Sequence, residues 1–115
     1  MKVSFGIIYE NSKIPALLSI FIRIKAITLF PFIFIRGRGD DVLINHERIH
    51  LAQQKEMLIL PFYLLYVFFY VKNIFKYKSS SLAYREIPFE KEAFENDNDQ
   101  VYLLKRKRFA WINYI

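Results

Sequence analysis

The sequence predicts an α+β fold that is mostly helical, with a small antiparallel sheet near the N-terminus. Residues 3–35 are rich in Ile, Phe and Val without a helical stripe, which favours strands. Most of the remaining chain carries apolar residues at spacings that a helix can use. A length of 115 residues, 54% of them hydrophobic and 24% charged, is typical of one folded domain, residues 1–115.

Ile27–Ile35 (ITLFPFIFI) is the clearest candidate strand. Because Pro31 cannot donate a hydrogen bond to a ladder, we expect this strand to lie at a sheet edge or to carry a bulge. The preceding stretch, Ile14–Phe21, is compatible with either a helix or a strand.

A helix is expected from Val42 to about Leu60, because apolar positions recur at helical spacing and neither Gly nor Pro interrupts them. Asp40 or Asp41, at the end of a turn that contains two glycines, can cap this helix. Pro61 then kinks or restarts the chain.

One further segment spans Pro61 and another follows it. Met57–Val71 contains no charged residue, yet it is shorter than the roughly 20 residues of a comfortable membrane span. A polar break at residues 76–81 separates it from Pro88, which suits the first turn of a short helix over residues 89–95. The polar run 96–99 ends that helix.

Composition and charge limit the classes of function. There is no cysteine, so a metal must be held by His, Asp or Glu. The net charge of +6 favours anionic surfaces such as lipid headgroups or nucleic acid. Glu10 interrupts the first apolar run, so no ordinary secretory signal is expected.

The residues that carry chemistry form the motif HExxH at positions 46–50, which contains both histidines of the chain. On a helix, His46 and His50 project from one face, close enough to share one tetrahedral Zn²⁺. Glu47 then lies beside the metal. From there its carboxylate can take a proton from a water molecule that attacks a carbonyl group.

A catalytic zinc site needs a third protein ligand, which in this chain must be Asp or Glu. Glu90 and Glu92 are the best placed, on a separate short helix that can pack against the first. Ala93 allows a close approach between the two helices. Glu56, six residues after His50, is expected to point away from the metal.

HERIH at 46–50, followed by FEKEAF at 89–94, resembles a minimal gluzincin, the HExxH…E branch of zinc metallopeptidases. Residues 46–54 are also similar to a small-domain subgroup with the pattern HExxHxxQQ. The resemblance implies that His46 and His50 bind zinc and that Glu47 is the general base. It implies Glu90 as the third ligand, because many gluzincins place that Glu three residues before Ala; Glu92 is the alternative.

The resemblance implies further parts of a site. Gluzincins often carry Asp four residues after the ligand Glu, where this chain has Phe94 or, counted from Glu92, Asn96. They typically hold extended substrate on an edge strand before the HExxH helix, although residues 27–35 can equally just close a small sheet. Three tyrosines are candidates to polarise the substrate carbonyl: Tyr84, Tyr102 and Tyr114.

The sequence thus predicts zinc-dependent hydrolysis of a peptide or other amide bond, with a peptide or protein as substrate. The alternative is a non-enzymatic, small membrane-associated protein with a structural metal site or none. A single span at 57–75 would place His50 and Glu90 on opposite sides of a bilayer. We therefore expect the apolar helix to fold back or to dip into one leaflet, with three tyrosines near the interface: Tyr63, Tyr66 and Tyr70.

The basic aromatic tail, residues 101–115, has several interpretations. It is a solvated helix end or an interfacial anchor, in which Lys and Arg contact phosphates while Trp111 and Tyr114 lie among headgroups. Nucleic acid is the least favoured partner, because no recognition motif accompanies the basic run. The expected location is a membrane surface, or otherwise the cytoplasm; the membrane side and the oligomeric state stay open.

Overall fold

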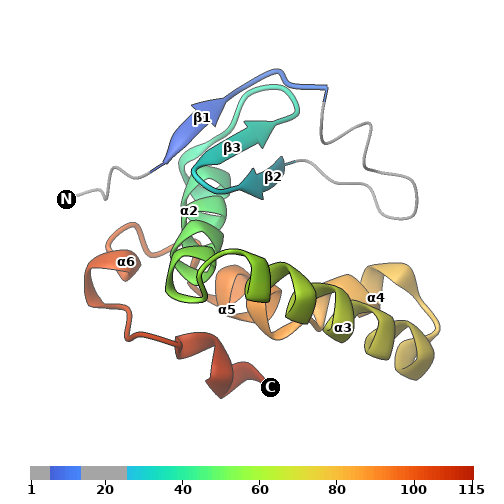
Figure 1. The fold of residues 1–115 in the computed structure, drawn as a ribbon. Helices are drawn as coiled ribbons and strands as arrows, with labels where there is room; N and C mark the ends of the chain where they lie inside the picture. The colour runs from blue at the N-terminus through green and yellow to red at the C-terminus, as the bar shows by residue number, and fades with distance from the viewer. Residues whose placement is uncertain (1–5, 14–25) are drawn as a thin grey trace.

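The computed structural model describes residues 6–13 and 26–115, which form a small sheet followed by a series of helices (Figure 1). The predicted α+β class, mostly helical with a small sheet near the N-terminus, is confirmed. The stretch Ile14–Phe21, for which helix and strand were both compatible, lies outside the described residues.

The sheet contains β1 (Ile7–Tyr9), β2 (Ala26–Leu29) and β3 (Phe32–Ile35) in the order β1-β3-β2. β2 pairs with β3 in antiparallel orientation, but β1 pairs with β3 in parallel orientation. The prediction of an antiparallel sheet was therefore wrong for β1. The chain between β1 and β3 is long enough for the crossover that parallel pairing requires, and a pattern of apolar residues carries no information about strand direction.

The prediction of one strand over Ile27–Ile35 was also wrong, because the structure divides this segment into β2 and β3. Pro31 lies in the turn between them, where the missing N–H costs no ladder hydrogen bond. β2 lies at an edge of the sheet and β3 lies at its centre.

α2 (Asp41–Glu56) carries the HExxH motif and begins where the sequence predicts. Asp40 is the capping residue: its carboxylate accepts a hydrogen bond from the Leu43 amide at 2.8 Å. One side of α2 packs on the sheet through a cluster of Leu51 with Ile33 and Ile35, which are fully buried. The opposite side faces the later helices.

α3 (Leu60–Tyr77) starts after a sharp turn and has Pro61 in its first turn, so of the two alternatives at this proline, a kink or a restart, the structure shows the restart. Leu58 and Ile59 form the turn with positive φ angles of 58° and 71°. Within the described ranges no single helix is both long and apolar enough to cross a bilayer; α2 and α3 pass that test only as a pair bent by 115°.

α4 (Ser80–Arg85) packs back against α3, where the Asn73 amide donates to the Ala83 carbonyl at 3.1 Å. α5 (Pro88–Asn96) then runs beside α2, and Pro88 opens it as the sequence predicts. A second core fills the space between α3, α5 and the C-terminal tail. Its buried members are Met57, Phe62, Phe69, Ile87, Phe89 and Trp111.

The tail consists of α6 (Tyr102–Lys105) and a 3-10 helix, η1 (Ala110–Tyr114). Trp111 is buried, with its ring centroid 4.7 Å from that of Phe89. The Tyr114 hydroxyl accepts a hydrogen bond from the Asn96 amide at 3.1 Å. Among the interpretations of the tail, an anchor with Trp111 among lipid headgroups does not fit this burial, because the side chain covers the aromatic core.

Candidate metal centre

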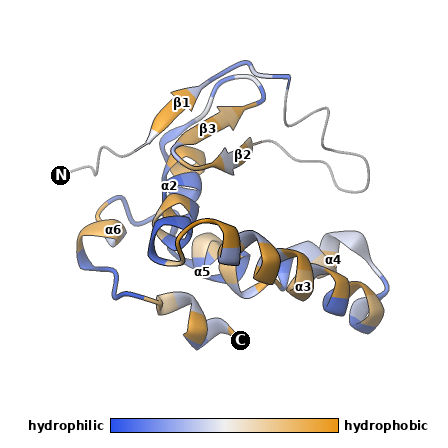
Figure 2. Cartoon of the chain, viewed as in Figure 1, coloured by the Kyte–Doolittle hydropathy of each residue, from blue (hydrophilic) through white to orange (hydrophobic). Residues whose placement is uncertain are grey.

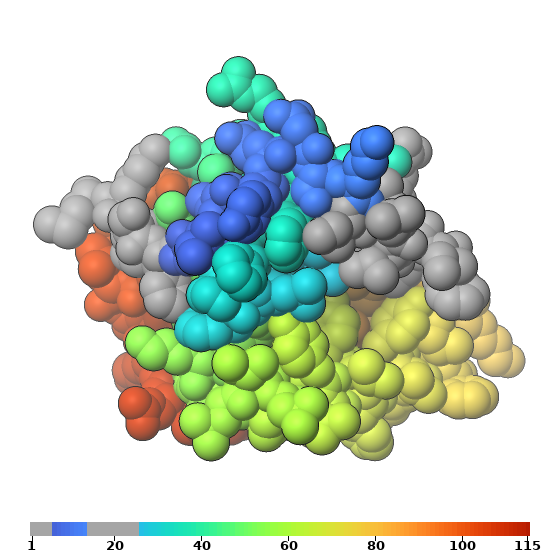
Figure 3. Space-filling model, turned by 45° about the horizontal axis from the view of Figure 1, so that its top comes forward, coloured from blue at the N-terminus to red at the C-terminus, as the bar shows by residue number. Residues whose placement is uncertain are grey.

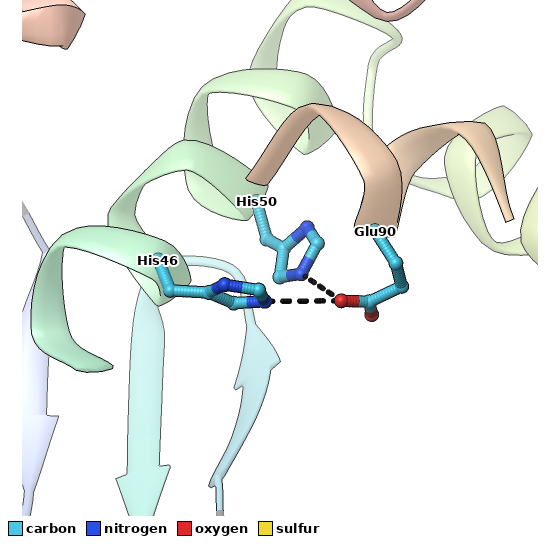
Figure 4. Close-up of side chains that lie close together, drawn as sticks. All are labelled: His46, His50 and Glu90. Carbon is cyan, nitrogen blue, oxygen red and sulfur yellow. Dashed lines mark hydrogen bonds and ion pairs between the residues drawn. The ribbon is translucent and has the colours of Figure 1, made fainter. Parts of the chain in front are cut away.

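The structure brings together the three residues that the sequence singles out as metal ligands. His46 and His50 lie on α2, Glu90 lies on α5, and all three side chains are buried and point toward one another (Figure 4). The Nε2 atoms of both histidines lie 3.0 Å from the same carboxylate oxygen, Oε1 of Glu90. The three candidate ligand atoms lie within 4.8 Å of one another, so this group could hold a metal ion.

Each imidazole is held in place by a partner at its other ring nitrogen. The Nδ1 atom of His46 lies 3.0 Å from the Asp97 carboxylate, just after the end of α5. The Nδ1 atom of His50 lies 2.8 Å from the side-chain oxygen of Gln53, one turn further along α2. Such partners fix the orientation of a metal-binding histidine and the ring nitrogen that carries its proton.

The hydrogen bonds of Gln53 determine which ring nitrogen of His50 carries its proton. The Nε2 group of Gln53 faces two acceptors, the Phe89 carbonyl at 3.1 Å and the Glu92 carboxylate at 2.9 Å. These two hydrogen bonds orient the Gln53 amide so that its Oε1 faces His50. Because Oε1 can only accept, His50 must donate from Nδ1. Since Asp97 likewise accepts from Nδ1 of His46, both neutral rings present an Nε2 lone pair to Glu90.

The centre therefore places three electron-pair donors against one another. Two lone pairs and a carboxylate oxygen at 3.0 Å repel unless protons or a cation lie between them. A tetrahedral zinc ion with bonds of about 2.0–2.1 Å sets neighbouring ligand atoms about 3.3 Å apart, so a small outward shift of these side chains accommodates it. The donor set, two imidazoles and one carboxylate, fits a divalent metal of the first transition row.

Without a metal, the same contacts favour a proton on His50. Burial lowers the pKa of His50, but the charge and hydrogen bond of Glu90 outweigh it and raise this pKa to about 10. Burial also raises the pKa of the Glu90 carboxyl, and the two histidines more than reverse that effect, so the net shift is well below its usual range. The site thus attracts positive charge, whether protons or a metal ion.

Glu47 lies beside the candidate metal position, and each of its carboxylate oxygens has a polar neighbour. Its Oε1 accepts a hydrogen bond of 2.7 Å from the hydroxyl of Thr28, which is buried on β2. Its Oε2 lies 4.0 Å from Nε2 of His46. One oxygen is held by a hydrogen bond from the edge strand β2, and the other lies near a nitrogen of a candidate ligand, His46.

Glu92, the alternative third ligand, lies in a different cluster. Its carboxylate is fully buried and accepts hydrogen bonds from Gln53, Tyr102 and Arg106. Arg106 also forms a two-pronged ion pair with Glu56 at 3.0 and 2.9 Å. Glu56 therefore points away from the metal centre, as the sequence predicts, and Glu90 is the acid that meets both histidines.

Two tyrosines lie at Glu90. The Tyr66 hydroxyl donates to Oε2 of Glu90 at 2.6 Å, and Tyr84 lines the same pocket as this carboxylate. Burial first, and the Glu90 charge next, raise the pKa of both phenols, so both remain proton donors. Tyr84 was a candidate from the sequence, whereas Tyr66 was expected near a membrane interface and instead faces the site.

Three other tyrosines that the sequence singled out have hydrogen-bond partners outside the three candidate ligands. Tyr102 donates to Glu92 and Tyr114 pairs with Asn96, so neither of these two candidates reaches the metal centre. Tyr63, also expected near a membrane interface, donates to the Thr28 carbonyl at 3.1 Å.

A pocket of about 210 Å³ opens onto the centre between β2, α2 and α3. Its polar wall includes Glu47, His50 and Glu90, and its aromatic wall includes Tyr63 and Tyr66. Most of the lining is apolar, which is typical of a site that excludes water and binds a small side chain or ligand.

Comparisons of the chain with family models, curated proteins and solved structures gave no match.

Four residues that complete the site were not identified from the sequence. Asp97 lies seven residues after Glu90 and Gln53 three after His50, so helical spacing would have placed both on the metal-facing sides. Thr28 is a polar residue within an apolar strand, which is itself a signal. Tyr66 carries no such signal, because one aromatic residue among many in α3 is most simply read as core.

Proposed function

We propose that the chain is a zinc-dependent hydrolase that cleaves peptide or other amide bonds, similar to a minimal gluzincin. The observation that carries this proposal is the convergence of His46, His50 and Glu90, with Glu47 poised 4.0 Å from a ligand nitrogen. Three protein ligands leave one coordination position for water or substrate, whereas structural zinc sites normally have four protein ligands.

Zinc is the metal best suited to these residues and this reaction. Imidazole nitrogens and a carboxylate suit zinc, and two histidines with one glutamate form a known type of catalytic zinc site. When bound, zinc supplies a Lewis acid that polarises a carbonyl group and makes a water molecule more acidic.

Glu47 supplies the proton transfers. Its Oε2 accepts the proton of the attacking water while the water oxygen bonds to the carbonyl carbon. It then delivers this proton to the nitrogen of the leaving amine as the C–N bond breaks. The hydrogen bond from Thr28 to Oε1 holds the carboxylate in place for both steps.

Tyr84 is the candidate donor to the carbonyl oxygen as negative charge develops on it, because Tyr66 donates its hydroxyl proton to Glu90. Both phenols line the pocket, and their raised pKa values keep them protonated. A donor fixed before the reaction stabilises that charge most effectively. Tyr84 takes the role that the sequence left open among three tyrosines.

The edge strand β2 offers a place for an extended substrate, with one restriction. Gln54 donates to the Thr28 carbonyl at 3.0 Å and accepts from the Phe30 amide at 3.0 Å. These contacts occupy the second half of the edge, so a peptide that pairs with β2 would do so at its Ala26 end, where Ala26 and Ile27 line the pocket. A peptide or protein is therefore the proposed substrate.

Metal content and hydrolysis, measured on matched variants, test the proposal. Wild type, Glu47→Gln and His46→Ala are each loaded with zinc and dialysed, and zinc is counted by mass spectrometry. Cleavage of a mixed library of fluorogenic peptides is then followed. We expect about one zinc per chain in wild type and Glu47→Gln, and little zinc in His46→Ala. Cleavage should be about 10²–10⁴-fold slower in Glu47→Gln than in wild type.

Two results would contradict the proposal. A wild-type protein that retains no zinc would favour the non-enzymatic alternative. Equal cleavage by wild type and Glu47→Gln would remove the proposed general base.

A further inference from the structure

The outer face of α3 carries a continuous stripe of exposed apolar side chains. We call it the α3 stripe, and its members are Leu60, Leu64, Val67, Phe68, Val71 and Phe75. These side chains are 46–77% exposed, and their spacing of three, four and seven residues aligns them along one side of the helix. Figure 2 shows the apolar colour along most of α3, and Figure 3 shows α3 forming an outer face below the strands.

The exposure of this stripe is not explained by the internal packing of α3. Phe62, Phe69 and Asn73 face the interior. Tyr66 donates to Glu90 of the metal centre, and Tyr63 donates to the Thr28 carbonyl beside the pocket. The remaining side of the helix has no internal role among the described residues. Contiguous exposed apolar patches of this kind mark surfaces that bind a protein or a membrane.

The charges beside the stripe favour a membrane over a protein as the partner of this surface. Lys72 and Lys76 are exposed on α3 next to the stripe, Lys78 follows at the end of the helix, and α3 contains no acidic residue. Lysines beside an apolar helix face extend toward phosphates while their stems cover apolar surface. The net charge of +6 acts in the same direction.

We propose that the α3 stripe docks the protein on an anionic lipid bilayer, with α3 lying in the plane of the interface. The stripe enters the boundary between headgroups and acyl chains, and Lys72 and Lys76 bind lipid phosphates. The side of α3 that carries Tyr63 and Tyr66 stays with the protein, so docking leaves the metal-centre contacts in place. This surface differs from the tyrosine face that the sequence suggested.

Vesicle flotation with the full chain tests this proposal without relying on zinc or hydrolysis. One set of vesicles contains phosphatidylcholine alone, and a second set also contains phosphatidylglycerol. We expect binding to the anionic vesicles at low salt, with weaker binding at high salt because salt screens the lysines.

Matched variants separate the two parts of the surface. Leu64→Gln with Phe68→Gln removes apolar area from the stripe and should weaken binding at least about tenfold. Lys72→Glu with Lys76→Glu should weaken binding by about fivefold or more for each lysine. Ile7→Gln with Leu104→Gln, at residues that are 47% and 59% exposed on β1 and α6, is the control and should bind as wild type does.

Circular dichroism shows whether each variant keeps the wild-type helix content, since all of these positions are exposed. Equal flotation of wild type and the stripe variant would overturn the proposal. Equal binding to both sets of vesicles, at low and at high salt, would also overturn it. A wild-type dimer in solution that the stripe variant converts to monomer, without vesicle binding by either, would identify the stripe as an interface between two copies and overturn it as well.

Discussion

Both candidate ligand histidines have their Nδ1 atoms engaged, and this makes the cluster more specific than a pair of buried imidazoles. Asp97 and Gln53 accept from Nδ1 of His46 and His50, which leaves Nε2 of each ring directed at Glu90. An ordinary buried histidine needs one satisfied donor and one satisfied acceptor. Here the Nε2 atoms of both rings face a carboxylate oxygen, so the arrangement favours a proton or a metal ion between them.

The contact of Asp97 with His46 gives a prediction for metal affinity. Asp97→Ala removes the partner that orients the ring, and partners of this kind typically contribute 10–100-fold to metal affinity. We expect the zinc affinity, measured by competition with a chromophoric chelator, to fall by about that factor. Asp99→Ala is the matched control, because Asp99 pairs with Lys105 at the surface. An unchanged affinity in Asp97→Ala would show that Asp97 does not orient a ligand.

The raised pKa of His50 gives a prediction for stability in the absence of metal. The pKa is about 10 in the folded protein, against about 6.5 for an unperturbed histidine, so protonated His50 stabilises the fold. This contribution is fully present below about pH 6.5 and is lost as the pH rises through about 10. With EDTA present, the free energy of unfolding by urea should therefore decrease between pH 7 and 10.

Zinc provides the control for this pH dependence. A bound metal replaces the proton between His50 and Glu90, so the zinc-loaded protein should not lose this contribution over the same range. Similar curves with zinc and with EDTA would argue against a metal at this position.

At the level of residues, helical spacing selected His46 and His50 as candidate ligands, and the resemblance to gluzincins favoured Glu90 over Glu92. His46 and His50 are the only histidines, and Glu90 opens the first turn of a short helix. The partners of these ligands were harder to identify. Asp97 and Thr28 act through contacts between elements whose relative positions no local pattern specifies.

Among the elements, the C-terminal tail is joined to α2 and α5 by a buried ion-pair cluster. Arg106 meets Glu56 on α2 and Glu92 on α5, and its side chain is only 5% exposed. Glu92 in turn accepts from Gln53, which holds His50. The basic run of the tail therefore contains a structural arginine as well as exposed cations.

This cluster gives a prediction for stability. Arg106→Met leaves two buried carboxylates without their cation, and removing one partner of a buried pair typically costs about 3–5 kcal/mol. We expect urea unfolding to show a loss of this size. Arg108→Met, two residues away and exposed, should change the free energy of unfolding by less than about 0.5 kcal/mol. A loss below about 1 kcal/mol in Arg106→Met would contradict a buried structural role.

The elements themselves were predicted well where local signals are strong. Asp40 as a cap and the prolines at 61 and 88 placed the starts of three helices. The sheet and the tail were less predictable. The direction of β1 and the burial of Trp111 both depend on packing between distant segments, and neither has a counterpart in local periodicity.

Across the whole molecule, α2 lies between two cores. One core joins α2 to the sheet, and the other fills the space between α3, α5 and the tail. The candidate metal centre joins α2 to α5, and Glu47 is anchored on the sheet through Thr28. A metal ion would therefore stabilise the contact between the two halves of the fold as well as supply chemistry.

The central claim, that His46, His50 and Glu90 together bind one metal ion, is tested most directly by X-ray absorption spectroscopy of the zinc-loaded protein. The account predicts a four-coordinate ion with two imidazole nitrogens and oxygen ligands at about 2.0–2.1 Å. In His50→Ala, the signal of one imidazole should disappear. A six-coordinate shell of oxygen alone, or an unchanged imidazole signal in His50→Ala, would contradict the account.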